Sequence, residues 1–167
     1  MVKSLLIGLI GLVFCASCHP VKELNQTDDD LVHPAAVQTY KSYYSKREIS
    51  KSLYRSYKKL YGNGMSMADK SEDFNPSDVW MKRVPGRRFI FGANSVSGDF
   101  ELFVFEEGGI ALKNFCVISK KNAGSEGAIL AIYLFGRPGD INALKEIIAR
   151  KAYEISRGTV IGSRVYL

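Results

Sequence analysis

The chain is short of histidine, cysteine and tryptophan, and the shortage of histidine excludes several kinds of site. Among 167 residues there are two histidines, three cysteines and one tryptophan. Both histidines, His19 and His33, lie beside prolines in a polar stretch near the N-terminus. We therefore expect the folded part to contain no histidine-ligated metal, no histidine general base and no Ser-His or Cys-His pair.

Other signatures of catalysis are also scarce. The sequence has no phosphate-binding G-x-x-x-x-G-K-[ST] loop. Ser56 and Lys59 match S-x-x-K, but the S-D-N and K-T-G elements that accompany it in penicillin-binding enzymes are missing. Acids at the ends of expected strands could serve glycoside hydrolysis, yet no spacing singles out a pair among Asp99, Glu101, Glu106 and Glu107. We expect no enzyme, no catalytic residue, no cofactor and no metal site.

No apolar run is long enough to span a bilayer as a helix. Residues Leu5 to Phe14 form an apolar run of ten residues, with Lys3 before it and the small residues Ala16 and Ser17 after it. A positive charge, a short apolar run and small residues, in this order, are typical of a secretory signal peptide. We therefore expect the protein to be exported.

The end of this segment, Cys15-Ala-Ser-Cys18, resembles the lipobox of bacterial lipoproteins, although Cys15 stands where the family usually has Leu. The resemblance covers residues 1–18 and implies that residues 1–17 are removed and that Cys18 carries the lipid. It further implies a lipid anchor in the cell envelope. His19 is not the Asp-type retention signal of the family, which favours the outer membrane. The alternative is ordinary cleavage, after which Cys18 could pair with Cys116 or Cys116 could remain a lone thiol.

The remaining chain divides into a tether and one domain. Residues 18–34 are polar and bounded by prolines, so we expect a flexible tether there. The tether contains three adjacent acids, Asp28 to Asp30. Such a run in a linker is more often solvated than metal-binding. Residues 35–167 are long and hydrophobic enough for a single packed core, with Cys116 buried in it.

The hydrophobic patterns predict an α+β domain. We expect an amphipathic helix within residues 35–61, with a capping box at Ser45 to Glu48, and a second helix from Asp140 to Ser156. Between and after them, period-two patterns predict strands at residues 88–93, 99–107, 109–120, 127–135 and 159–167. The expected fold is a mainly antiparallel sheet of four to five strands, with an N-terminal amphipathic helix and a C-terminal helix packed on it.

Function is indicated only by layout and charge. A small exported domain on a tether resembles, in layout alone, the accessory lipoproteins of secretion or conjugation systems, so we expect a non-catalytic protein-binding or assembly role in an envelope complex. The alternative is a binder of anionic lipid, glycan or cell-wall polymer, consistent with a net charge of +6. Nucleic acid is not an expected partner of an exported protein. The candidate binding cations lie around a Val-Pro-Gly turn and on the polar face of the first helix: Lys82, Arg83, Arg87, Arg88, Arg47, Lys51, Arg55 and Lys58.

Overall fold

The structure is a computed structural model that describes residues 25–62, 66–77, 79, 81, 83–121 and 129–159. The signal peptide, Cys18, Lys82 and the last expected strand beyond residue 159 therefore lie outside the described residues.

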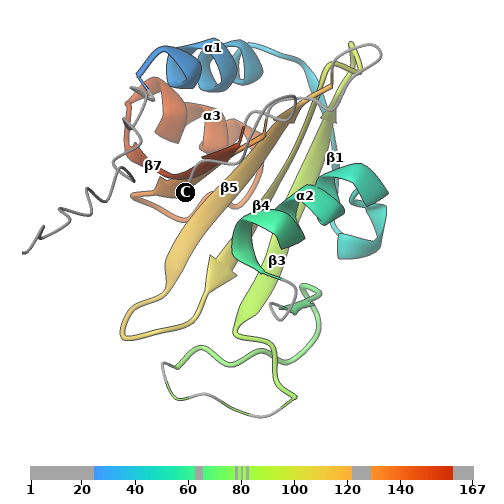
Figure 1. The fold of residues 1–167 in the computed structure, drawn as a ribbon, viewed down its shortest axis with the longest axis vertical. Helices are drawn as coiled ribbons and strands as arrows, with labels where there is room; N and C mark the ends of the chain where they lie inside the picture. The colour runs from blue at the N-terminus through green and yellow to red at the C-terminus, as the bar shows by residue number, and fades with distance from the viewer. Residues whose placement is uncertain are drawn as a thin grey trace, which may run out of the picture.

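One twisted sheet organises the described part of the chain (Figure 1). Its seven strands have the order β1-β3-β4-β5-β6-β7, and β2 pairs with β3 beside β1. All neighbours are antiparallel except β2 and β3. The strands are β1 (Tyr40–Tyr43), β2 (Met67–Ala68), β3 (Arg87–Ser95), β4 (Phe100–Glu107), β5 (Lys113–Lys120), β6 (Ile129–Leu134) and β7 (Tyr153–Thr159).

The α+β class and the mainly antiparallel sheet are confirmed, but the expected number of strands was too low. Two short strands, β1 and β2, were not expected, and β1 lies where we expected helix. The helix expected at residues 140–156 ends at Ala149, and β7 begins at Tyr153. In each case pairing with a distant strand decides the conformation against the local pattern.

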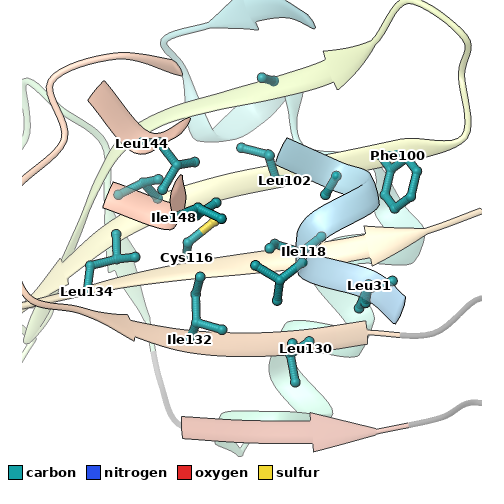
Figure 2. Packing of buried hydrophobic residues seen from close by; sticks show 14 of the residues in the cluster. Leu31, Phe100, Leu102, Cys116, Ile118, Leu130, Ile132, Leu134, Leu144 and Ile148 are labelled. Carbon is teal, nitrogen blue, oxygen red and sulfur yellow. The ribbon is translucent and has the colours of Figure 1, made fainter. Parts of the chain in front are cut away.

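Two helices cover one face of the sheet. They are α1 (Asn25–Ala36) and α3 (Ile141–Ala149). Figure 2 shows Leu31 of α1 and Leu144 and Ile148 of α3 with the strand residues of this face, which we call the aliphatic face because branched aliphatic side chains dominate it. Burial of Leu31, Val32 and Ala35 places α1 in the domain, although we expected a tether up to residue 34. The apolar Leu-Val-Xaa-Xaa-Ala spacing, hidden by the flanking acids and proline, accounts for this difference.

The opposite face carries α2 (Lys51–Tyr61), preceded by a 3₁₀ turn η1 (Lys46–Glu48). The apolar side of α2 packs on strand residues that are mostly phenylalanine, and we call this the aromatic face. Ser45 caps η1 and not the α-helix, so the expected capping box does not mark the start of α2. Its N-cap is Ser50, whose Oγ accepts a hydrogen bond from the backbone N–H of Leu53 at 3.2 Å.

Buried Glu101 fixes the start of α2 on the sheet. Its Oε1 accepts a hydrogen bond from the Ser50 backbone N–H at 2.8 Å, and the side chain has no exposed surface. A carboxylate below a helix N-terminus satisfies an otherwise unpaired N–H and lies at the positive end of the helix dipole. Lys121 Nζ lies 3.5 Å from the other carboxylate oxygen. Pairing with Ser119 of β5 fixes the position of Glu101 in the sheet. The hydrogen bond to Glu101 thus sets where α2 begins.

A β-bulge in β3 allows its phenylalanines to pack on both the aliphatic face and the aromatic face. The register passes from Phe89↔Phe105 to Phe91↔Val104, which leaves Ile90 unpaired. In a regular strand Phe89 and Phe91 would lie on one face, because side chains alternate and these two are separated by one residue. With the bulge, Phe89 joins the aromatic face and Phe91 the aliphatic face. The sheet is consequently covered on both sides.

Candidate functional site

Of the cations predicted around the Val-Pro-Gly turn, the three that the structure describes, Arg83, Arg87 and Arg88, do not form one cluster. Arg83 is exposed in a turn with φ 69°. Arg87 and Arg88 are neighbours in β3 and point to opposite faces, where they pair with the cross-strand residues Glu107 and Glu106. Because both guanidinium groups already hold carboxylates, neither is available as a free clamp for an anionic ligand.

Arg87 is a structural residue of the aromatic face. Only 4% of it is exposed, and its Nε donates a hydrogen bond to Glu107 Oε2 at 2.5 Å. Its Nη1 donates to the Tyr57 hydroxyl at 3.1 Å, and the guanidinium carbon lies 4.3 Å from the ring centre of Tyr61 and 5.4 Å from that of Phe105. Burial alone would lower the pKa of Arg87, but Tyr57 and Glu107 outweigh it and raise the pKa. The charge is thus held inside the fold by an acid and a box of aromatic rings.

Arg88 neutralises the second buried carboxylate. Glu106 has no exposed surface, and its Oε1 accepts a hydrogen bond from Arg88 Nε at 2.5 Å. Arg137 Nε lies 3.5 Å from the other oxygen. The Arg88 guanidinium also lies over the Phe74 ring, 4.2 Å from its centre. A fully buried carboxylate needs such partners, which explains why two cations converge on it.

The acids considered for glycoside hydrolysis do not form a pair. Glu106 belongs to the aliphatic side of β4 and Glu107 to the aromatic side, since they are consecutive in one strand. Glu101 shares the face of Glu107 but lies six residues away, about 20 Å along the strand. Asp99 is exposed beyond the strand's start. Each carboxylate that is buried instead serves an ion pair or a helix terminus.

No metal or thiol chemistry is visible in the described residues either. Within those ranges no group of three His, Cys, Asp or Glu side chains could hold a metal ion. Cys116 is fully buried in the aliphatic core, and burial raises the pKa of its thiol far above the usual range. A thiol that stays protonated is a weak nucleophile, so Cys116 is a packing residue.

The cations predicted on the first helix remain accessible. Arg47, Lys51 and Arg55 are exposed, and Lys58 is half-buried with its Nζ 4.9 Å from the ring centre of Tyr54. Cys18, the predicted lipid acceptor, and Lys82 lie outside the described residues.

The surface that stands out is apolar and lies at one end of the sheet. Large hydrophobic side chains are exposed on three neighbouring segments there: the loop before β3, the β4–β5 hairpin and the end of β6. In Figure 1 that loop and the hairpin form the lower end of the molecule. We call this surface the apolar end; its residues and exposures are Val79 (67%), Met81 (50%), Ile110 (96%), Leu112 (49%) and Phe135 (54%).

Backbone contacts bring the first two segments together. The N–H of Gly109 donates to the Pro76 carbonyl at 3.1 Å, and the N–H of Gly108 to the Gly86 carbonyl at 2.9 Å. A side chain at position 108 would collide with the backbone of Asn75 and Pro76, so this approach requires glycine. The loop and the hairpin therefore present one built surface.

The third segment joins through aromatic contacts. Phe135 makes an edge contact with Tyr133, and Tyr133 contacts Phe115 at the border of the aromatic core. Beside them lies an open groove of about 300 Å³, lined by Lys113, Phe115, Tyr133, Glu154, Ile155 and Ser156. Exposed apolar side chains gathered at one end of a domain are typical of an interaction surface.

The apolar end was missed by the sequence analysis, although a signal was present. Val79, Trp80 and Met81 form an apolar triplet between charged residues, and Ile110 and Leu112 occupy a hairpin turn that should be polar. Apolar residues in turns, where burial is hard to achieve, are the pattern that could have revealed it.

Comparisons with known proteins do not add a family. No protein-family model, no curated protein and no solved structure matches the chain. In the described part of the chain, no helix has the length and hydropathy needed to cross a membrane.

Proposed function

We propose that the protein is an exported bacterial lipoprotein, anchored through Cys18 in the cell envelope, where it acts as a non-catalytic protein-binding or assembly module. The lipobox-like segment supports the anchor and, through His19, the outer membrane. The observation that carries the binding role is the apolar end, where five large hydrophobic side chains are at least 49% exposed.

The arrangement of the polar groups supports binding over catalysis. Glu101, Glu106, Arg87 and Arg88 each have a structural partner, and Cys116 is buried. A protein interface, by contrast, needs a desolvated apolar centre and a polar rim. The apolar end offers both kinds of residue, because the exposed cations Arg83, Lys113 and Arg137 follow Met81, Leu112 and Phe135 within two residues in the sequence.

Photo-crosslinking in intact cells tests this role. A benzoylphenylalanine at position 110 should give one discrete protein adduct, because Ile110 is 96% exposed at the centre of the patch. The matched control is position 96, since Val96 is 72% exposed in the β3–β4 turn at the opposite end of the sheet. Leu112→Ser should remove the adduct without lowering the melting temperature. The same products at both positions, or lipid products alone, would contradict a protein interface at this end.

A further inference from the structure

A second surface is defined by charge. The outer side of α2 and the turn before it carry five cations: Arg47, Lys51, Arg55, Lys58 and Lys59. We call this the basic face. The residues Lys51–Tyr61 include no acid, so the helix does not neutralise its own charge. All of these cations are exposed except Lys58, which is half-buried beside Tyr54.

Some of the described cations outside the basic face are in ion pairs. Lys46 pairs with Glu72, Arg87 with Glu107, Arg88 with Glu106, and Lys121 approaches Glu101. None of the ion pairs found among the described residues involves the basic face. Single exposed cations elsewhere, such as Lys41, Lys113 and Lys151, are also outside these ion pairs, so what distinguishes α2 is that its unpaired cations are clustered on one helix face.

Helix stability does not account for this charge. Lys58 and Lys59 in the last turn interact favourably with the negative end of the helix dipole. Lys51 in the first turn, however, lies at the positive end, and no acid lies in that turn; Glu48 of η1, which is also exposed, is the nearest acid in the sequence. Lys51, Arg55 and Arg47 thus have no role in folding that the contacts of α2 reveal, which points to a ligand outside the protein.

The shape of the surface limits what that ligand is. The apolar side of α2 is occupied by the sheet, as burial of Leu53, Tyr57 and Leu60 shows, so the helix cannot insert into a membrane core. Its outer side faces away from the sheet in Figure 1, and eleven residues span about 16 Å. Flexible cations on a ridge suit a flat surface of diffuse negative charge and not a pocket-bound anion.

We propose that the basic face binds the anionic phospholipid headgroups of a bilayer and orients the domain on it. The proximity of a bilayer rests on the proposed lipid anchor, which would hold the whole domain at high effective concentration near it. The anchor precedes α1, which lies on the face of the sheet opposite α2, so the domain must turn for α2 to meet the bilayer. The apolar end belongs to another side of the molecule and stays accessible to a protein partner (Figure 1).

The experiment uses the full chain as purified from an exporting host, incorporated into phosphatidylcholine vesicles with or without phosphatidylglycerol. A fluorophore is attached at Ser52→Cys on α2 or at Asn142→Cys on α3, both exposed and on opposite faces of the sheet. Headgroup-nitroxide lipids should quench the α2 label on phosphatidylglycerol vesicles, and salt should reverse the quenching. The α3 label should stay bright, as should both labels on phosphatidylcholine alone. Equal quenching of both labels would overturn the proposal.

Charge variants show whether binding to the vesicles depends on the basic face or only on the net charge of the protein. Lys51→Gln with Arg55→Gln should weaken binding to phosphatidylglycerol vesicles about 30-fold, since each cation near an anionic leaflet contributes about fivefold. The matched control, Lys41→Gln with Lys151→Gln, removes the same charge from exposed sites outside α2 and should have little effect. Equal losses in both pairs, or equal binding to a soluble anionic polymer, would contradict a bilayer site. If Cys18 carries no lipid, the same titration with added vesicles still tests the basic face, so the two proposals fail separately.

Discussion

The two faces of the sheet are both covered by helices, but they are built from different chemistry. The aliphatic face joins α1 and α3 to the sheet through side chains such as Leu102, Ile118 and Leu144. The aromatic face joins α2 to it through stacked and edge-on rings, with Arg87 buried among them. Branched aliphatic side chains need only volume, whereas rings, hydroxyls and charges also need particular partners. The aromatic face should therefore be the more sensitive of the two to small chemical changes.

The largest loss of stability should come from breaking the ion pair of the aromatic face. Glu107→Ala leaves the 4%-exposed Arg87 without its carboxylate, and we expect a loss of about 2–3 kcal/mol in the free energy of unfolding. Arg87→Met should cost less, because Glu107 is 33% exposed and can be hydrated. Urea unfolding of both variants measures the two losses in the free energy of unfolding. A smaller loss for Glu107→Ala than for Arg87→Met would show that the aromatic box alone stabilises the cation.

The next largest loss of stability should come from the close contact between Tyr43 and Gly92 on the aromatic face. Tyr43 lies over Gly92, its cross-strand partner, and a methyl group at position 92 would overlap the Tyr43 ring. Gly92→Ala should cost about 2 kcal/mol, as overpacking usually does. In a Tyr43→Ala background the same change should cost almost nothing. Additive losses in a double-mutant cycle would mean that the two residues do not compete for this space.

A matched pair of substitutions then compares the faces directly. Phe105 and Ile118 are both fully buried in the sheet, one on each face. Phe105→Leu removes ring contacts with Tyr57, Tyr61 and Phe115, whereas Ile118→Leu keeps the volume and the chemistry. We expect Phe105→Leu to lower stability by about 1 kcal/mol more than Ile118→Leu. Equal losses in thermal or urea unfolding would remove the distinction between the faces.

The smallest effect is a pH dependence at the margin of the aromatic face. Burial alone would raise the pKa of Asp69, but hydrogen bonds from the Ser45 hydroxyl (2.8 Å) and the backbone N–H groups of Lys46 and Lys70 outweigh it and lower the pKa. A lowered pKa in the folded state adds stability above the unfolded value of about 3.9 and loses it as the pH falls through the folded value. The difference in melting temperature between wild type and Asp69→Asn should therefore shrink from about pH 6 to about pH 3. A constant difference would exclude this contribution.

The sequence predicts the central strands and the start of the third helix well, because their patterns are local and strong, whereas the expected helix runs too far and includes the first residues of β7. The expected strands at 99–107 and 127–135 correspond to β4 and β6, and Asp140 caps α3 by accepting hydrogen bonds from the N–H groups of Asn142 and Ala143. The start of β1 is different. Tyr40 to Tyr43 fit a helical pattern locally, and only pairing with β3, with Gly92 making room for Tyr43, makes them a strand.

The candidate sites show the same limit. From the sequence, Arg87 and Arg88 are expected to be an exposed pair of cations, because the acids with which they pair lie about 20 residues away in the sequence. Two cations and two acids at facing strand ends were the available signal, but only the register assigns each pair to a face. The exposed cations of α2, by contrast, follow from one helical period and lie where the pattern places them.

The proposed function depends on a lipid attached to Cys18. The intact mass of the membrane-extracted mature protein, from wild type and from Cys18→Ser, tests it most directly. We predict that the wild-type chain begins at Cys18 and carries a diacylglycerol adduct, and that the variant lacks both the adduct and the cleavage. A wild-type chain with an unmodified Cys18, or one that begins elsewhere, would contradict the anchor and leave a freely diffusing exported domain.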